Sequence, residues 1–308
     1  MAGKTIAKSP NQKEGIKMST LSYHEQKDRD NTIHLRELIK GLPPFCARFF
    51  RGIEPRTSSR TRIAYAYDLK VFFEFLVQEI PEFQGMTITD IRLEQMDHLH
   101  AADLEEFMEY LKYRCNDKNQ EVINKEQGIM RKLSTLKSFY HYFFRQEELK
   151  TNPAALVQMP KLHEKEIIRL DIDEVALLLD EVEQGDCLTP KQKAYHAKTK
   201  VRDLALLTLL LGTGIRVSEC VGLNLQDVDF KNDGIRIHRK GGKEVTVYFG
   251  QEVEEALTHY LEEREKIIPE SGHEDALFLS LQNKRLSVRS VENLVKKYAR
   301  IVTPLKKI

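Results

Sequence analysis

The sequence predicts a mostly helical protein of two compact domains, the second of which also holds a small antiparallel sheet. Apolar residues recur at helical spacing through the first half of the chain, without a convincing strand. A charged stretch after Pro160 separates the halves, and a Gly-Gly pair between two alternating segments predicts a hairpin in the second half. At 308 residues, the chain is long enough to form two hydrophobic cores.

Composition excludes several classes of protein. The 48 Lys and Arg residues nearly balance 47 Asp and Glu, so affinity for a polyanion must come from the distribution of charge. The longest apolar run is too short to cross a bilayer and the N-terminus lacks an apolar signal segment, which indicates a cytoplasmic protein. Neither the histidines nor the cysteines have the spacing of metal ligands, so we expect no metal site and reduced thiols. The cysteines are Cys46, Cys115, Cys187 and Cys220.

The first part of the chain is predicted to be a tail followed by a helical domain. Residues 1–33 are polar with little apolar periodicity, so we expect them to be disordered, and helices should follow over residues 34–151. Thr57-Ser58-Ser59 supplies N-cap residues for a helix, and further helices are predicted over 103–113 and 121–145. Their apolar stripes are Tyr65, Leu69, Phe72 and Leu76, then Leu104, Phe107, Met108 and Leu111, then Ile129, Leu133, Leu136, Tyr140 and Phe143.

The second domain is predicted to be α+β and to span residues 170–308. Residues 152–169 form the expected linker, because Pro153 stops the preceding helix and a charged stretch follows. Asp171 and Asp173 mark the start of a new helix, and the helix over 200–211 is apolar nearly all round, which predicts a central position. The remaining predicted elements are strands at 228–230, 235–238 and 244–249, helices at 251–267 and 287–301, and an extended segment at 277–279.

Two cationic positions in this domain suit chemistry on a phosphodiester, which requires fixed donors for the charged oxygens and a proton for the departing oxygen. Arg216 follows Gly212-Thr213-Gly214 and begins a helix, so it could hold an anion near a helix N-terminus. The alternative is that the glycine caps the preceding helix and Arg216 only pairs with Glu219. Lys240 and Lys243 lie at the hairpin tip, where they could enter a DNA groove or simply be solvated.

The segment from Leu209 to Phe249 carries a family resemblance. It reads LLLGTGIRVSECVGLNLQDVDF and then IRIHRKGGKEVTVYF, and it resembles the first half of the active site of the tyrosine recombinase, or phage integrase, family of site-specific integrases. The resemblance implies that Arg216 binds the scissile phosphate, that Lys240 is the general acid on the 5′ oxygen and that Glu219 orients Arg216. It also implies a SAM-like core-binding domain, a catalytic domain, and no metal or nucleotide cofactor.

The same resemblance makes an absence informative. The family requires a His-x-x-Arg segment, a later His or Trp and a late tyrosine nucleophile, and these 308 residues contain no segment that matches them. Tyr298 lies in VKKYARIV and is interpreted as a packing or phosphate-contacting residue. We therefore expect a mobile-element recombinase whose catalytic domain is incomplete at its C-terminus and which binds DNA without cleaving it alone. The alternatives are a non-catalytic protein that occupies recombination sites and a helical interaction protein with no nucleic-acid role.

Two segments of the first domain, TSSRTRIAYAYDLKVFFEFL and INKEQGIMRKLSTLKSFYHYFFR, resemble helices of the family's core-binding domain. The second segment places small, polar and cationic side chains opposite its apolar stripe, which permits close approach to a major groove, although solvated faces often look the same. In the family the two domains clamp double-stranded DNA and intact members form tetramers. The predicted DNA-binding residues are Arg56, Arg60, Arg62, Asn124, Gln127, Arg131, Lys132, Thr135 and Lys243.

Overall fold

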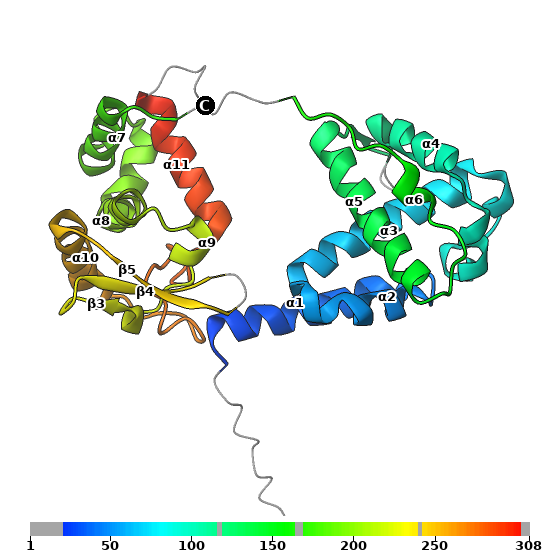
Figure 1. Ribbon diagram of the computed structural model, residues 1–308. Coiled ribbons are helices and arrows are strands. Elements are labelled where there is room, and N and C mark those ends of the chain that lie inside the picture. The colour runs from blue at the N-terminus through cyan, green and yellow to red at the C-terminus, as the bar shows by residue number, and fades with distance from the viewer. Residues whose placement is uncertain (1–20, 116–118, 164–168, 240–241, 303–308) are drawn as a thin grey trace, which may run out of the picture. The chain divides into compact units, whose positions relative to one another are not determined.

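The computed structural model describes residues 21–115, 119–163, 169–239 and 242–302 (Figure 1). The chain divides into two compact units, Met1–Glu164 and Lys165–Ile308, and each has a hydrophobic core of its own. The prediction of a mostly helical protein with a small antiparallel sheet in its second part is confirmed.

The first unit is helical (Figure 1), and short 3-10 turns lie in two of the connections between its α-helices. Its α-helices are α1 (Tyr23–Lys40), α2 (Cys46–Ile53), α3 (Ser59–Glu79), α4 (Ala101–Lys112), α5 (Glu126–Arg145) and α6 (Pro153–Leu156). The 3-10 turns are η1 (Glu54–Arg56), η2 (Pro81–Phe83), η3 (Ile88–Asp90) and η4 (Leu93–His98), and two short strands are β1 (Arg114–Cys115) and β2 (Glu121–Val122).

Helix α1 begins inside the segment predicted to be disordered, so that prediction was wrong for the described part of the tail. Ser22 and Glu25 form a capping box, in which each side chain accepts from the backbone N–H of the other residue. The helix then packs on α3, where Asn31 Nδ2 donates to Ser59 Oγ at 3.1 Å. The polar sequence of this segment did not predict a helix, because much of the helix's stability comes from tertiary contacts. The rest of the predicted tail, residues 1–20, lies outside the described residues.

The core of the first unit is formed where α3, α4 and α5 meet. Ser58 caps α3 as predicted, since its Oγ accepts from the Thr61 N–H at 3.2 Å, and the apolar stripes of the three helices are largely buried. The hairpin β1–β2 was not predicted, and it delays the start of α5 to Glu126. Strands of two residues carry no readable periodicity, which explains the omission.

The second unit packs helices around the long, central α8 (Figure 1). Its helices are α7 (Ile172–Gln184), α8 (Pro190–Thr213), α9 (Val217–Cys220), α10 (Gln251–Arg264) and α11 (Val288–Val302), with the 3-10 turn η5 (Leu225–Asp227). The antiparallel sheet has the order β3 (Val228–Asp229), β4 (Gly234–His238), β5 (Glu244–Tyr248). The three strands lie where the alternating pattern predicted them.

Helix α8 is longer than predicted, because its first half is polar and was not recognised as helical. Thr189, the N-cap residue, forms a capping box with Gln192 in the first turn. Pro190, between them, is a favourable first helical residue. The prediction that the helix is central is confirmed for its apolar second half, where Leu206 and Leu209 are fully buried. The helix contributes to the second unit's core and ends at Thr213, three residues before Arg216.

Candidate functional site

The turn that precedes Arg216 contains two glycines with different structural roles. Gly214 ends α8 in the left-handed conformation (φ 65°), and its N–H donates to Leu210 O at 3.0 Å. Gly212 allows close helix packing, because a Cβ there would lie 2.7 Å from Val253 Cγ2 of α10. The turn then presents Arg216 as the N-cap residue of α9.

Arg216 is anchored at two points on one carboxylate. Its backbone N–H donates to Glu219 Oε2 at 2.8 Å and its Nη1 donates to Glu219 Oε1 at 3.0 Å. The Glu219 side chain is 6% exposed, whereas the Arg216 side chain is 73% exposed. The expected Arg216–Glu219 pair therefore exists, yet most of the guanidinium still faces solvent and is accessible to an anion. Because α9 has only four residues, its dipole adds little to the attraction.

The hairpin that carries the predicted general acid lies next to this turn in the fold. Helix α9, which follows Arg216, contacts β4, the strand that leads toward Lys240. Lys240 itself lies outside the described residues. The residues that flank the tip are described. Arg239 N–H donates to Lys243 O at 2.7 Å, and Lys243 is exposed.

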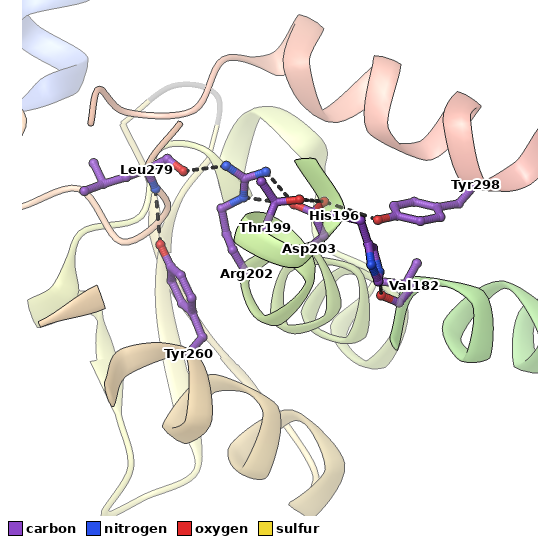
Figure 2. Close-up of polar contacts among 8 residues, drawn as sticks. All are labelled: Val182, His196, Thr199, Arg202, Asp203, Tyr260, Leu279 and Tyr298. Atoms are coloured by element: carbon purple, nitrogen blue, oxygen red, sulfur yellow. Dashed lines mark hydrogen bonds and ion pairs between the residues drawn. The ribbon is translucent and has the colours of Figure 1, made fainter. Parts of the chain in front are cut away.

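A buried polar network on α8 was missed by the sequence analysis (Figure 2). Asp203 is 2% exposed and accepts hydrogen bonds from Thr199 Oγ1 at 3.0 Å and Arg202 Nε at 2.9 Å. Arg202 Nη1 donates to Leu279 O at 2.8 Å, which ties α8 to the extended segment that was predicted at 277–279. The available signal was a charged Arg-Asp pair directly before the apolar second half of the helix.

Tyr298, the last tyrosine of the chain, belongs to the same network (Figure 2). It is fully buried, and its hydroxyl lies 3.5 Å from Asp203 Oδ2. Burial raises the pKa of Tyr298 above its ordinary value, and the neighbouring Asp203 charge raises it further. A buried phenol that is hard to ionise fits the interpretation of Tyr298 as a packing residue.

The predicted DNA-binding face of α5 is narrower in the structure than the sequence indicated. Gln127 and Arg131 are exposed, and Asn124 is half-buried. Thr135 and Lys132 are buried, so their predicted place on the exposed face was wrong. Thr135 faces inward because α3 also packs on α5, a long-range contact that helical periodicity does not report. Lys132 is held by Asn124, which lies just before α5.

The two buried residues take part in internal hydrogen bonds. Thr135 Oγ1 and Arg131 Nη1 both donate to Asp68 Oδ2 of α3, at 2.9 Å and 2.6 Å. Lys132 Nζ donates to Asn124 Oδ1 at 2.9 Å. Arg131 thus combines a half-exposed guanidinium with a fixed position on a buried carboxylate.

The arginines near the start of α3 also separate into two kinds. Arg56 and Arg60 are exposed. Arg62 is 5% exposed and its Nη1 lies 3.1 Å from Glu54 Oε1, so its predicted role on phosphates was wrong. Arg62 faces inward because it lies on the same face of α3 as the apolar stripe, where its charge is neutralised by Glu54.

Asp68→Asn should change how stability depends on pH. Burial raises the pKa of Asp68 above its ordinary value of 3.8, with the charge of Arg131 acting in the opposite direction. Ionised Asp68 therefore costs stability, and the advantage of its protonated form is lost as pH rises through the raised pKa.

We expect the unfolding free energy of the variant, relative to wild type, to rise between about pH 3 and pH 7 in urea titrations. The control Ser134→Ala changes no ionisable group, and its difference from wild type should be constant. A fall for Asp68→Asn would mean that the ion pair outweighs burial.

Within the described ranges, no group of three or more His, Cys, Asp or Glu is placed to hold a metal ion. No helix in that part of the chain is long and apolar enough to cross a membrane.

Comparisons with known proteins agree for both units. Residues 169–302 match the phage integrase family and residues 47–147 match the phage integrase N-terminal SAM-like domain. Tyrosine recombinase XerC of Caldanaerobacter subterraneus subsp. tengcongensis is 34% identical over 269 residues, which cover 83% of this chain and 68% of that protein.

Two solved structures show the same fold at low identity. The Tn1549 transposon integrase in complex with circular intermediate DNA has a TM-score of 0.57 at 18% identity, covering 85% of this chain and 82% of that one. A lambda integrase tetramer bound to a Holliday junction has a TM-score of 0.55 at 15% identity, covering 93% of this chain and 69% of that one. With matches to both domains and a relative of this similarity, the chain belongs to the phage integrase, or tyrosine recombinase, family.

Proposed function

We propose that this protein acts in site-specific DNA recombination, that Arg216 holds the scissile phosphate of a bound duplex and that Lys240 supplies the proton for the departing 5′ oxygen. The observation that carries the proposal is the anchored but open guanidinium of Arg216, which is fixed on buried Glu219 and 73% exposed. Family membership supports the reaction class.

The Arg216 arrangement suits a phosphate for a physical reason. A guanidinium has five N–H donors, and the contact with Glu219 uses only one side of the fork. The remaining donors match two oxygens of one phosphate, and anchoring lowers the conformational entropy that binding would otherwise cost. Glu219 therefore acts as a positioning residue.

The first unit supplies the proposed duplex-binding surface. Gln127 and Arg131 on α5 are exposed and suited to base edges in a major groove, while Arg56 and Arg60 are suited to backbone phosphates. We propose that the two units enclose double-stranded DNA in the cytoplasm and that recombination uses an assembly of several copies. The DNA complexes among the similar structures, including one tetramer, support this assignment.

The assignment of Arg216 is tested with a neutral phosphate. A site would first be selected from random duplexes, and single phosphates in it would then be replaced by methylphosphonates. At the scissile position we expect the replacement to weaken wild-type binding by about 1 kcal/mol and to leave Arg216→Ala binding unchanged, because the same contact is already absent. Equal losses for both proteins at every position would refute the role.

Arg216→Ala should leave the fold and most of the duplex affinity intact. The side chain is exposed, and Glu219 keeps its hydrogen bond from the backbone N–H, so we expect a loss of less than about 1 kcal/mol in unfolding free energy. Thermal melting and fluorescence anisotropy would measure the two quantities, with Arg216→Lys as the matched control. A large fall in melting temperature would show that Arg216 is a structural residue.

We also propose that the 308-residue form binds DNA without cleaving it, because it contains no His-x-x-Arg segment and its last tyrosine is buried. The second candidate function, a non-catalytic protein that occupies recombination sites, is favoured by the same burial of Tyr298. A nicked suicide duplex followed by a denaturing gel should show no protein–DNA adduct, while an intact relative on its own site serves as the positive control. An adduct would refute both the absence of cleavage and the second candidate.

A further inference from the structure

A hollow of about 400 Å³ lies in the first unit, between the α2–η1 segment and the second half of α5. Its position places it beside the start of α3, on the part of α5 that follows the proposed major-groove residues. The hydrogen-bond donors that line it are the side chains of Arg56, Thr57, Ser138, His141, Arg145 and Gln146.

The lining of this hollow is cationic and has no carboxylate. Two arginines and a histidine contribute to it, and no Asp or Glu does. Two nearby acidic residues are paired elsewhere, Glu54 with Arg62 and Glu148 with Arg48, and Glu147, which follows Gln146, is exposed and does not line the hollow. Within the described residues, Arg56 and Arg145 have no ion-pair partner, so their charge is available to an external anion.

The walls of the hollow are held by helix packing. Tyr142 of α5 lies against Gly52 of α2, where a Cβ would approach Tyr142 Cε2 to 2.1 Å. Only a glycine allows this approach, so the ring keeps α2 and α5 in a defined spacing. His141 and Arg145 are four residues apart on one face of α5, and Ser138 lies one turn earlier on the same side. The backbone positions from which these donors extend are therefore set by helix packing.

The separation along α5 between the hollow and Arg131, a proposed groove-reading residue, also suits a contact with the DNA backbone. Arg145 follows Arg131 by fourteen residues of one helix, nearly four turns, so both lie on the same side of α5 and about 21 Å apart along its axis. A major groove is about 12 Å wide. If α5 crosses the groove with Arg131 inside it, Arg145 lies past the groove edge, where the sugar-phosphate strand runs.

We propose that this hollow binds a backbone phosphate of the duplex that the α5 face reads, an inference that rests on the proposed function. Two guanidinium forks meet the charged oxygens, and the Ser138 hydroxyl and Gln146 amide supply neutral donors. The contact fixes the register of the protein on DNA without reading sequence. It adds His141, Arg145 and Gln146 to the residues that the sequence had assigned to DNA, among which is Arg56.

The test is the salt dependence of duplex binding by the full chain, measured by fluorescence anisotropy. For the double variant Arg56→Gln/Arg145→Gln we expect the slope of log K against log[salt] to become shallower by about 0.9 for each lost phosphate contact. The preference for the selected site over random duplex should be unchanged. The matched control Arg36→Gln removes an exposed arginine from α1, outside the hollow, and should leave the slope as in wild type. Circular dichroism melts would establish that each variant is folded.

The outcomes separate this inference from the proposed function. If the double variant keeps the wild-type slope, or loses no more than Arg36→Gln, the hollow does not bind the duplex backbone. Saturable binding of inorganic phosphate at the hollow, without any change in slope for the double variant, would also overturn it. If the wild type itself binds duplex DNA without salt dependence, the proposed function fails instead.

Discussion

Asp203→Ala is expected to lower the unfolding free energy of the second unit by about 3–5 kcal/mol, because it removes one partner of a buried ion pair. Asp203 is 2% exposed and accepts from Arg202, Thr199 and the Tyr298 hydroxyl (Figure 2). Without the carboxylate, a guanidinium and two hydroxyls are left in a poorly hydrated environment.

The expected effect extends beyond α8. Arg202 also donates to Leu279 O, and Tyr260 OH accepts from Leu279 N–H at 3.2 Å (Figure 2). Tyr260 OH in turn donates to Leu277 O at 3.0 Å. The network therefore ties α8 and α10 to the extended segment that precedes α11. We expect hydrogen exchange to accelerate in α8, α11 and this segment together.

The measurement is hydrogen exchange of the full chain, combined with chemical denaturation followed by circular dichroism. Tyr298→Phe is the matched control, since it removes one hydroxyl from the same network and should cost only about 0.5–1.5 kcal/mol. Protection in the first unit should not change in either variant. A loss for Asp203→Ala no greater than that for Tyr298→Phe would mean that the ion pair contributes little.

Arg131→Ala is expected to weaken specific duplex binding by about 1–3 kcal/mol and to relax base preference at one or two positions of the site. The side chain is half-exposed, and its Nη1 is fixed on Asp68 at 2.6 Å. This fixed position leaves the other side of the guanidinium fork directed away from the carboxylate. A preorganised fork loses little entropy when it meets a base edge.

The variant also disturbs the fold, and the experiment has to separate the two effects. Asp68 would keep only Thr135 as a donor, so we expect a stability loss of about 1–3 kcal/mol, which Asp68→Asn in the same chain should partly restore. Affinity would be measured on a panel of singly substituted duplexes below the melting transition. Arg60→Ala, at a proposed phosphate contact, should weaken all duplexes equally. The same uniform pattern for Arg131→Ala would contradict base reading.

Helical periodicity located α5 and its apolar stripe, but it assigned the polar residues to the wrong surroundings. Lys132 and Thr135 are next to apolar residues in sequence, and both are buried. Thr135 donates to Asp68 of the distant α3, and Lys132 donates to Asn124 in the segment just before α5. The periodicity of a helix predicts one buried face, whereas packing against two neighbouring elements can bury two of its faces. Arg62 was assigned to DNA for another reason, because its charge was taken to indicate exposure, although it lies on the face of the apolar stripe and is buried beside Glu54.

The sequence by itself determined the mostly helical fold, the hairpin, the family and the pairing of Arg216 with Glu219. These depend on short-range spacing, on turn residues and on one long ordered motif, all of which are readable from neighbours in the chain. Only the tertiary structure decided that Asp203 and Tyr298 share a buried network and that Arg56 and Arg145 share one hollow. Burial and charge pairing are set by contacts between residues distant in sequence, where local patterns carry no information.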